Sequence, residues 1–194
     1  MKRFALAVAA LAASAGFAAA QDVPPKVQAQ CQSCHGPGGD SRDAHTPRLN
    51  GQTANYLQSR LKSFRDPTRQ SIAAIHAMWD ISSHVGDEDI PAIAQYYARQ
   101  TPAPPSGKNS ALAKQGARLY ALGAKGIPAC ASCHGAHGEG TAIAPRLAGQ
   151  HGLYLDYQIT AFTVTMRAQG TMNHTALDIT QPQIDALVAY LAKD

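Results

Sequence analysis

The chain has 194 residues, of which 17 are lysine or arginine and 13 are aspartate or glutamate, so its formal net charge is +4. A charge excess this small argues against nucleic-acid binding, which needs a clustered basic face. The 8 histidines stand singly in the sequence, and no nucleophile, base and oxyanion donors group together. We therefore do not expect an enzyme.

Residues 1–20 have the order of a secretory signal peptide. Lys2 and Arg3 give a charged start, an Ala-rich apolar stretch follows, and residues 18–20 form a small-residue cleavage site. A retained membrane anchor is the alternative, but a spanning helix needs about 20 strongly apolar residues. We predict export with cleavage after Ala20 and exclude this segment from the fold.

A Cys-x-x-Cys-His-Gly motif comes next, at Cys31, Cys34 and His35. This motif is the signal for covalent haem attachment, in which two thiols add to the haem vinyl groups and the histidine supplies an axial nitrogen to iron. Two cysteines on one helical turn present both sulfurs to one porphyrin edge. The motif therefore predicts a c-type haem.

The rest of the first half is predicted to be helical, because no apolar run alternates as a strand would. Leu57, Leu61 and Phe64 mark one helix. A second helix carries an apolar stripe at helical spacing, formed by Ile90, Ile93, Ala94 and Tyr97.

Residues 101–107, with the sequence Thr-Pro-Ala-Pro-Pro-Ser-Gly, favour extended backbone and cannot continue a helix. We place a linker here, between domains at 21–100 and 108–194. Each domain is near the small end of what folds alone, so a cofactor in its core is expected.

The second half repeats the first. The haem motif returns at Cys130, Cys133 and His134, and the sequence Pro-Arg-Leu-x-Gly-Gln occurs at 47–52 and again at 145–150. This recurrence favours haem over the other uses of four cysteines, which are three possible disulfide pairings or a structural zinc site. A thioredoxin-like pair would need a βαβ setting that this sequence lacks.

Two helices of the second half have further sequence signals. One carries Gly116 within a stripe that includes Ala113 and Tyr120. The last helix begins at a capping box of Thr180 and Gln183.

Met78 and Met172 are the predicted sixth ligands of the two irons. Met78 lies 12 positions before Ile90, and Met172 lies 12 before Ile184, where each isoleucine opens the last helix of its half. A thioether ligand raises the reduction potential relative to a second histidine, whereas a methionine that only fills a core gap needs no such register. The rival ligands lack counterparts in register: His76, His84, Met166 and His174. We interpret three more histidines as surface or loop residues: His45, His137 and His151.

The surroundings of each haem can also be predicted from the repeats. The carbonyls of Pro47 and Pro145 lie at similar distances after the two haem histidines, so they are candidate acceptors for the second ring N–H. Side chains that recur as pairs are candidates for holding haem propionates, since arginine pairs well with carboxylate. Ordinary solvated residues are the alternative for these six: Arg48, Arg146, Gln52, Gln150, Tyr56 and Tyr154.

These motifs resemble the class I c-type cytochromes and, among them, the tandem dihaem cytochrome c4 family, over essentially the whole chain after residue 20. The resemblance implies an all-α protein of two small cytochrome domains, each wrapped around one covalent haem with His/Met ligation. It also implies a bacterial periplasmic carrier without a membrane segment, which passes electrons from a quinol-oxidising complex or a dehydrogenase to a terminal oxidase. The chain departs from the pattern at Pro24 and Pro25, where no counterpart of the Gly116 helix is expected.

Two other functions stay open. The chain resembles the electron-accepting subunits of periplasmic dehydrogenases, which share these motifs. If one haem has lost its methionine ligand, its iron has an open position, and the protein would be an enzyme or a gas sensor. A haem with both axial positions filled cannot bind a substrate at iron, which favours the carrier.

Overall fold

The computed structural model describes residues 22–65, 77–107, 109–167 and 170–193. The predicted signal peptide and His76 lie outside these ranges. Within them the protein is built from helices, and β-pairing is confined to isolated bridges. The predicted all-α class is therefore confirmed. None of the helices in the described part of the chain combines the length and apolar character needed to cross a bilayer.

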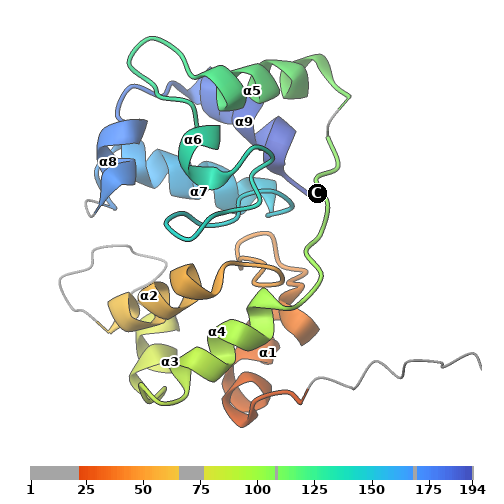
Figure 1. The fold of residues 1–194 in the computed structure, drawn as a ribbon, viewed down its shortest axis with the longest axis vertical. Coiled ribbons are helices and arrows are strands. Elements are labelled where there is room, and N and C mark those ends of the chain that lie inside the picture. Colours follow the sequence, from red (N-terminus) through yellow and green to blue (C-terminus); the bar gives the residue numbers. More distant parts are fainter. Residues whose placement is uncertain (1–21, 66–76, 108, 168–169, 194) are drawn as a thin grey trace, which may run out of the picture.

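Short helices surround one apolar core in the first half. In chain order they are η1 (Val27–Cys31), α1 (Gln32–His35), η2 (Pro37–Gly39), α2 (Ala54–Phe64), α3 (Trp79–Ser83) and α4 (Ile90–Ala98). α2 packs against both α3 and α4 (Figure 1). The stripe predicted from Ile90 is confirmed, because its four residues are all buried in α4.

The first half opens with one helical run over residues 25–35, which leads directly into the haem motif. Pro24 and Pro25 lack a backbone N–H, and the following five-residue element η1 has π-type hydrogen bonds. Val27 anchors this segment in the core with no exposed surface. The segment then tightens into the single turn α1, which carries the haem motif.

The second half has longer helices. They are α5 (Ala111–Leu122), α6 (Ala131–His134), α7 (Gly152–Thr163), α8 (Thr171–Ala176) and α9 (Gln181–Leu191). α5 begins at Ser110, whose hydroxyl accepts the Ala113 N–H at 3.0 Å. In the predicted capping box at the start of α9, the Gln183 side chain accepts the Thr180 N–H at 2.9 Å.

The crossing of α5 and α9 depends on Gly116. A Cβ at this position would lie 1.8 Å from the carbonyl oxygen of Ala186. The absence of a side chain therefore lets the two helix backbones approach closely, and α7 also packs against α9.

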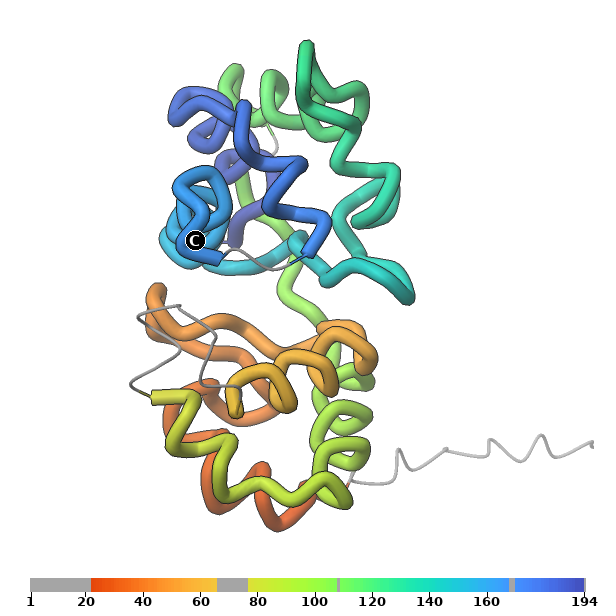
Figure 2. Tube along the Cα trace, turned by 90° about the vertical axis from the view of Figure 1, so that its left-hand side faces the viewer, coloured from red at the N-terminus to blue at the C-terminus, as the bar shows by residue number. Residues whose placement is uncertain are grey.

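The two halves lie one above the other and are joined by an extended segment (Figures 1 and 2). This segment is residues 101–107, where the structure has no helix. The domain limits at 21–100 and 108–194 remain a prediction from sequence.

Candidate haem sites and the junction between them

The four cysteines of the two haem motifs are not joined to one another in disulfides. None of the three disulfide pairings considered from the sequence is therefore formed. Zinc has no support either, because the described ranges contain no group of three or more histidine, cysteine or carboxylate side chains placed to hold a metal.

The first cysteine of each motif lies against the apolar core of its half. Burial raises the pKa of the thiols of Cys31 and Cys130. A redox-active Cys-x-x-Cys pair has the opposite property, a lowered thiol pKa. This environment therefore disfavours a thioredoxin-like function.

The haem histidines are held in the way the repeats predict. His35 Nδ1 lies 2.9 Å from the carbonyl oxygen of Pro47, and His134 Nδ1 lies 2.8 Å from that of Pro145. A carbonyl only accepts, so Nδ1 donates and the lone pair of Nε2 is left for a metal. Burial lowers the pKa of both rings, which favours the neutral form that binds iron. This donor set fits a covalent haem at each motif.

In each half, a loop that contains glycine brings the proline carbonyl next to the haem histidine. In the first half the Leu49 N–H donates to Gly39 O at 2.8 Å, and in the second half the Leu147 N–H donates to Gly138 O at 2.8 Å. Both glycines have positive φ angles, 84° and 75°, which other residues adopt at a cost. The same loop geometry is therefore built twice.

The two predicted methionine ligands lie at or next to short helices. Met78 precedes α3 and is half-buried, and Met172 lies in α8, where it packs against a cluster that includes Ile127 and Ile184. No described contact joins either thioether to its histidine, so axial ligation by methionine stays a prediction. Among the described rivals, His84 is exposed and bonded to Asp80 O.

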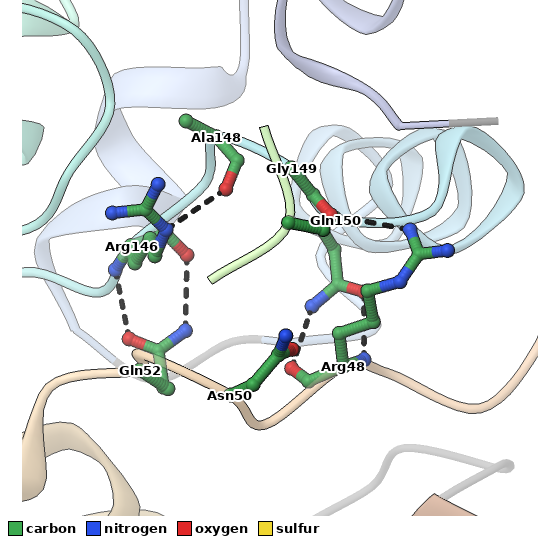
Figure 3. Close-up of a pocket in the computed structure, with 8 residues that line it drawn as sticks. Arg48, Asn50, Gln52, Arg146, Ala148, Gly149 and Gln150 are labelled. Carbon is green, nitrogen blue, oxygen red and sulfur yellow. Dashed lines mark hydrogen bonds between the residues drawn. The ribbon is translucent and has the colours of Figure 1, made fainter. Parts of the chain in front are cut away.

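Gln52 and Gln150 connect the two halves (Figure 3). Gln52 Oε1 accepts the Arg146 N–H at 2.8 Å, and its Nε2 donates to Arg146 O at 3.0 Å. Gln150 makes the same two bonds with the backbone of Arg48, at 2.8 and 3.0 Å. Each amide thus binds the other half's repeat, a role that the sequence did not indicate. Propionate binding by these four residues stays a prediction.

The side chains of Arg48 and Arg146 make different hydrogen bonds. Arg48 donates from Nη1 to Lys193 O at 2.7 Å and from Nε to Asp40 at 3.0 Å. Arg146 donates from Nε to Ala148 O at 3.0 Å, within its own loop. Arg48 therefore also fastens the end of the chain to the first half.

The repeated glycines next to these glutamines make room for the linker. A Cβ on Gly51 would lie 2.7 Å from Pro102, and one on Gly149 would lie 1.7 Å from Ala103 O. Their φ angles of 68° and 80° are also unfavourable for other residues. The cavity left between the two halves at these residues has a volume of about 10 Å³. It has room for about one water molecule and none for a cofactor.

His151 lies in the loop before α7, as one of its two interpretations had it, but it is buried at this junction and is not a surface residue. Only 5% of it is exposed, and Nε2 lies 3.0 Å from the carbonyl oxygen of Ser41 in the other half. His45 and His137 are exposed, as expected.

Tyr56 and Tyr154 lie on α2 and α7 and share a set of electrostatic neighbours. Arg60 stands 5.8 Å from the ring centre of Tyr56. Burial raises the pKa of Tyr154, and the charges of Arg60 and Arg167 oppose that rise. Sequence reasoning missed both arginines; the available signal was that Arg60 takes the place of Gln158 in the repeat.

Two family models match the chain in succession. Residues 18–96 match the model described as cytochrome c oxidase, cbb3-type, subunit III, and residues 113–193 match cytochrome c.

Curated relatives match over nearly the whole chain. Cytochrome c-552 of Acidithiobacillus ferridurans is 36% identical, over 96% of this chain and 83% of its own length. Cytochrome c4 of Azotobacter vinelandii is 32% identical, over 96% and 93%. A thiosulfate dehydrogenase electron acceptor of Thiomonas intermedia is 37% identical, over 98% and 90%. The solved cytochrome c4 of Acidithiobacillus ferrooxidans superposes with a TM-score of 0.77 at 36% identity, covering 83% of this chain and 96% of that one.

Proposed function

Because the chain belongs to the cytochrome c4 family, we propose that it carries electrons in a bacterial periplasmic respiratory chain. It is an electron carrier rather than an enzyme, and it has two covalent haem c groups, one at each Cys-x-x-Cys-His motif. The proposed donor is a quinol-oxidising complex or a dehydrogenase, and the proposed acceptor is a terminal oxidase.

The matched His–Pro contacts carry the proposal, because they prepare a neutral imidazole for iron in both halves. Each bound haem supplies a one-electron couple. If Met78 and Met172 also bind the irons, neither iron would offer a position for substrate, and the haems would supply electron transfer without substrate binding. The residues assigned to the haems are Cys31, Cys34, His35 and Met78 in the first half and Cys130, Cys133, His134 and Met172 in the second.

Absorption spectra test the two sites. We expect two haems per chain by the pyridine haemochrome assay and a full-strength far-red band from thioether-to-iron charge transfer. The reduced native protein should not bind carbon monoxide. A half-strength band together with carbon monoxide binding would contradict the carrier at one site and support a sensor or enzyme there.

Export through residues 1–20 belongs to the same proposal. Its support is the charged start, the apolar stretch and the small residues before Gln21. Mass spectrometry of the haem protein from a periplasmic extract should give a chain that begins at Gln21. A chain that retains Met1 and stays with the membrane fraction would show an anchor instead.

A second candidate is the electron acceptor of a periplasmic dehydrogenase. The 37% identity with a thiosulfate dehydrogenase electron acceptor favours it. Stopped-flow mixing distinguishes the two functions: the oxidised protein is mixed with a thiosulfate dehydrogenase and thiosulfate, or with quinol-oxidising membranes. Rapid reduction by the dehydrogenase alone would identify this second function, and rapid reduction by the membranes alone would identify the respiratory carrier.

A further inference from the structure

Arg60 is a half-buried cation at the junction of the two halves. It lies on α2, and its guanidinium carbon is 5.8 Å from the ring centre of Tyr56 and 5.7 Å from that of Phe64. Its charge also acts on Tyr154, which belongs to α7 of the other half. The guanidinium therefore lies near two aromatic rings of its own half and close enough to the other half to act on Tyr154.

No carboxylate compensates this charge within the described residues. The ion pairs found there join Arg48 to Asp40, Arg65 to Asp87 and His84 to Asp80, and none includes Arg60. Burial, and to a lesser extent the positive charge of Arg167, lower the pKa of Arg60 to about 10. A half-buried cation beside a second cation is unfavourable unless an anion lies close to both.

The repeat shows that this charge is not needed to build the helix. Gln158 occupies the matching position of α7, two residues after Asp156 and four before Phe162, as Arg60 stands four before Phe64. The cation that accompanies α7 is Arg167, which follows the helix, hydrogen-bonds to Gln158 and stacks 4.3 Å from the Phe162 ring centre. Each half thus places one guanidinium at the junction. The first half does so from within α2, and the second half from the segment after α7.

We infer that Arg60 binds a haem propionate at this junction and raises the reduction potential of that haem. Propionates are the carboxylates that a covalent haem brings to a protein, and arginine binds a carboxylate with two parallel hydrogen bonds. A compensating positive charge favours the reduced haem, which carries one electron more. The inference rests on the proposed function, because it requires haem at the motifs.

Cation–π packing is the competing explanation for Arg60. Contacts at 5.7 and 5.8 Å lie near the outer limit of about 6 Å for that interaction. If Arg60 serves only in packing, Arg60→Gln should change the free energy of unfolding but not the reduction potentials of the haems. The potentials therefore separate the two roles.

The test is spectroelectrochemistry of the holoprotein and of Arg60→Gln, which installs the residue that the other half already has. We expect a lower potential for at least one haem, with unchanged haem count and far-red band. The pKa of the propionate should also rise when its cation is removed. The reduction potential of that haem should therefore vary more with pH in Arg60→Gln than in the unchanged protein. Arg60→Lys keeps the charge and should restore most of the potential.

Arg118→Gln is the matched control, because it removes the same charge from an exposed position on α5. Its effect on the potentials should be small and should vanish at high salt, where exposed charges are screened. The inference is overturned if Arg60→Gln shifts neither potential beyond Arg118→Gln. Loss of the far-red band in the unchanged protein would instead contradict the proposed function, so the two failures are distinguishable.

Discussion

The side-chain amides of Gln52 and Gln150 each make two hydrogen bonds between the halves of this protein. The side chains of Gln52 and Gln150 are 6% and 7% exposed, and each satisfies both an N–H and a carbonyl of the other half. Buried backbone groups that lose such partners cost about 1–3 kcal/mol each. These residues therefore contribute far more than their small contact area suggests.

Replacement of Gln52 by alanine should destabilise the protein by about 2–6 kcal/mol, because the N–H and the carbonyl of Arg146 both lose their partner. Denaturant unfolding followed by far-UV circular dichroism measures the change. The control is Gln115→Ala, an exposed position on α5, which should stay within about 0.5 kcal/mol of the unchanged protein. Equal effects of the two variants would show that the glutamine contact is not stabilising.

The predicted iron ligands allow a similarly matched comparison. Met78→Leu and Met172→Leu should each halve the far-red band and open one haem to carbon monoxide, since leucine fills the volume without a sulfur. Met166→Leu should change neither, because it lies outside the register of the repeats. If Met166→Leu removes the band and Met172→Leu does not, the assignment in the second half is wrong.

Helices that pack within their own half can be predicted from local sequence patterns. The stripe of α4 and the capping box at Thr180 are readable from the sequence, because spacing and capping chemistry decide them. The His–Pro contacts were also predictable, since the loop is repeated. The roles of Gln150 and His151 were not, because their partners lie 102 and 110 residues away and leave no local pattern.

The crossing of α5 and α9 gives a prediction for a whole element. Gly116→Ala places a methyl group 1.8 Å from a backbone oxygen of α9, so the helices must separate. We expect a loss of about 1–3 kcal/mol, as for other overpacked cores. Lys114→Ala, an exposed change on the same helix, should be nearly neutral. A neutral Gly116→Ala in thermal unfolding would show that the helices do not cross as closely as described.

The molecule as a whole is two similar halves joined by one polar junction. The linker occupies part of that junction between Gly51 and Gly149, and Arg48 fastens the last residues of the chain to the first half. Such an arrangement predicts that the halves unfold together while the junction is intact.

A variant that combines Gln52→Ala, Gln150→Ala and Arg48→Ala should uncouple the halves. Calorimetry of the holoprotein should change from a single transition to two, with the two haems retained. Arg42→Ala, at an exposed position, serves as the charge-matched control for the arginine and should leave one transition. Two transitions in the unchanged protein would contradict the coupling.

The matching bonds that Gln52 makes to the backbone of Arg146 and Gln150 makes to that of Arg48 also bear on the history of the chain. A contact in which each partner offers the same group to the other is the isologous contact of a two-fold symmetric dimer. One sequence is enough to form it, so a single-domain ancestor with this glutamine and loop had what it needed to pair with a copy of itself. Gene duplication and fusion then needed only a linker, and the glycines beside the glutamines left space for one.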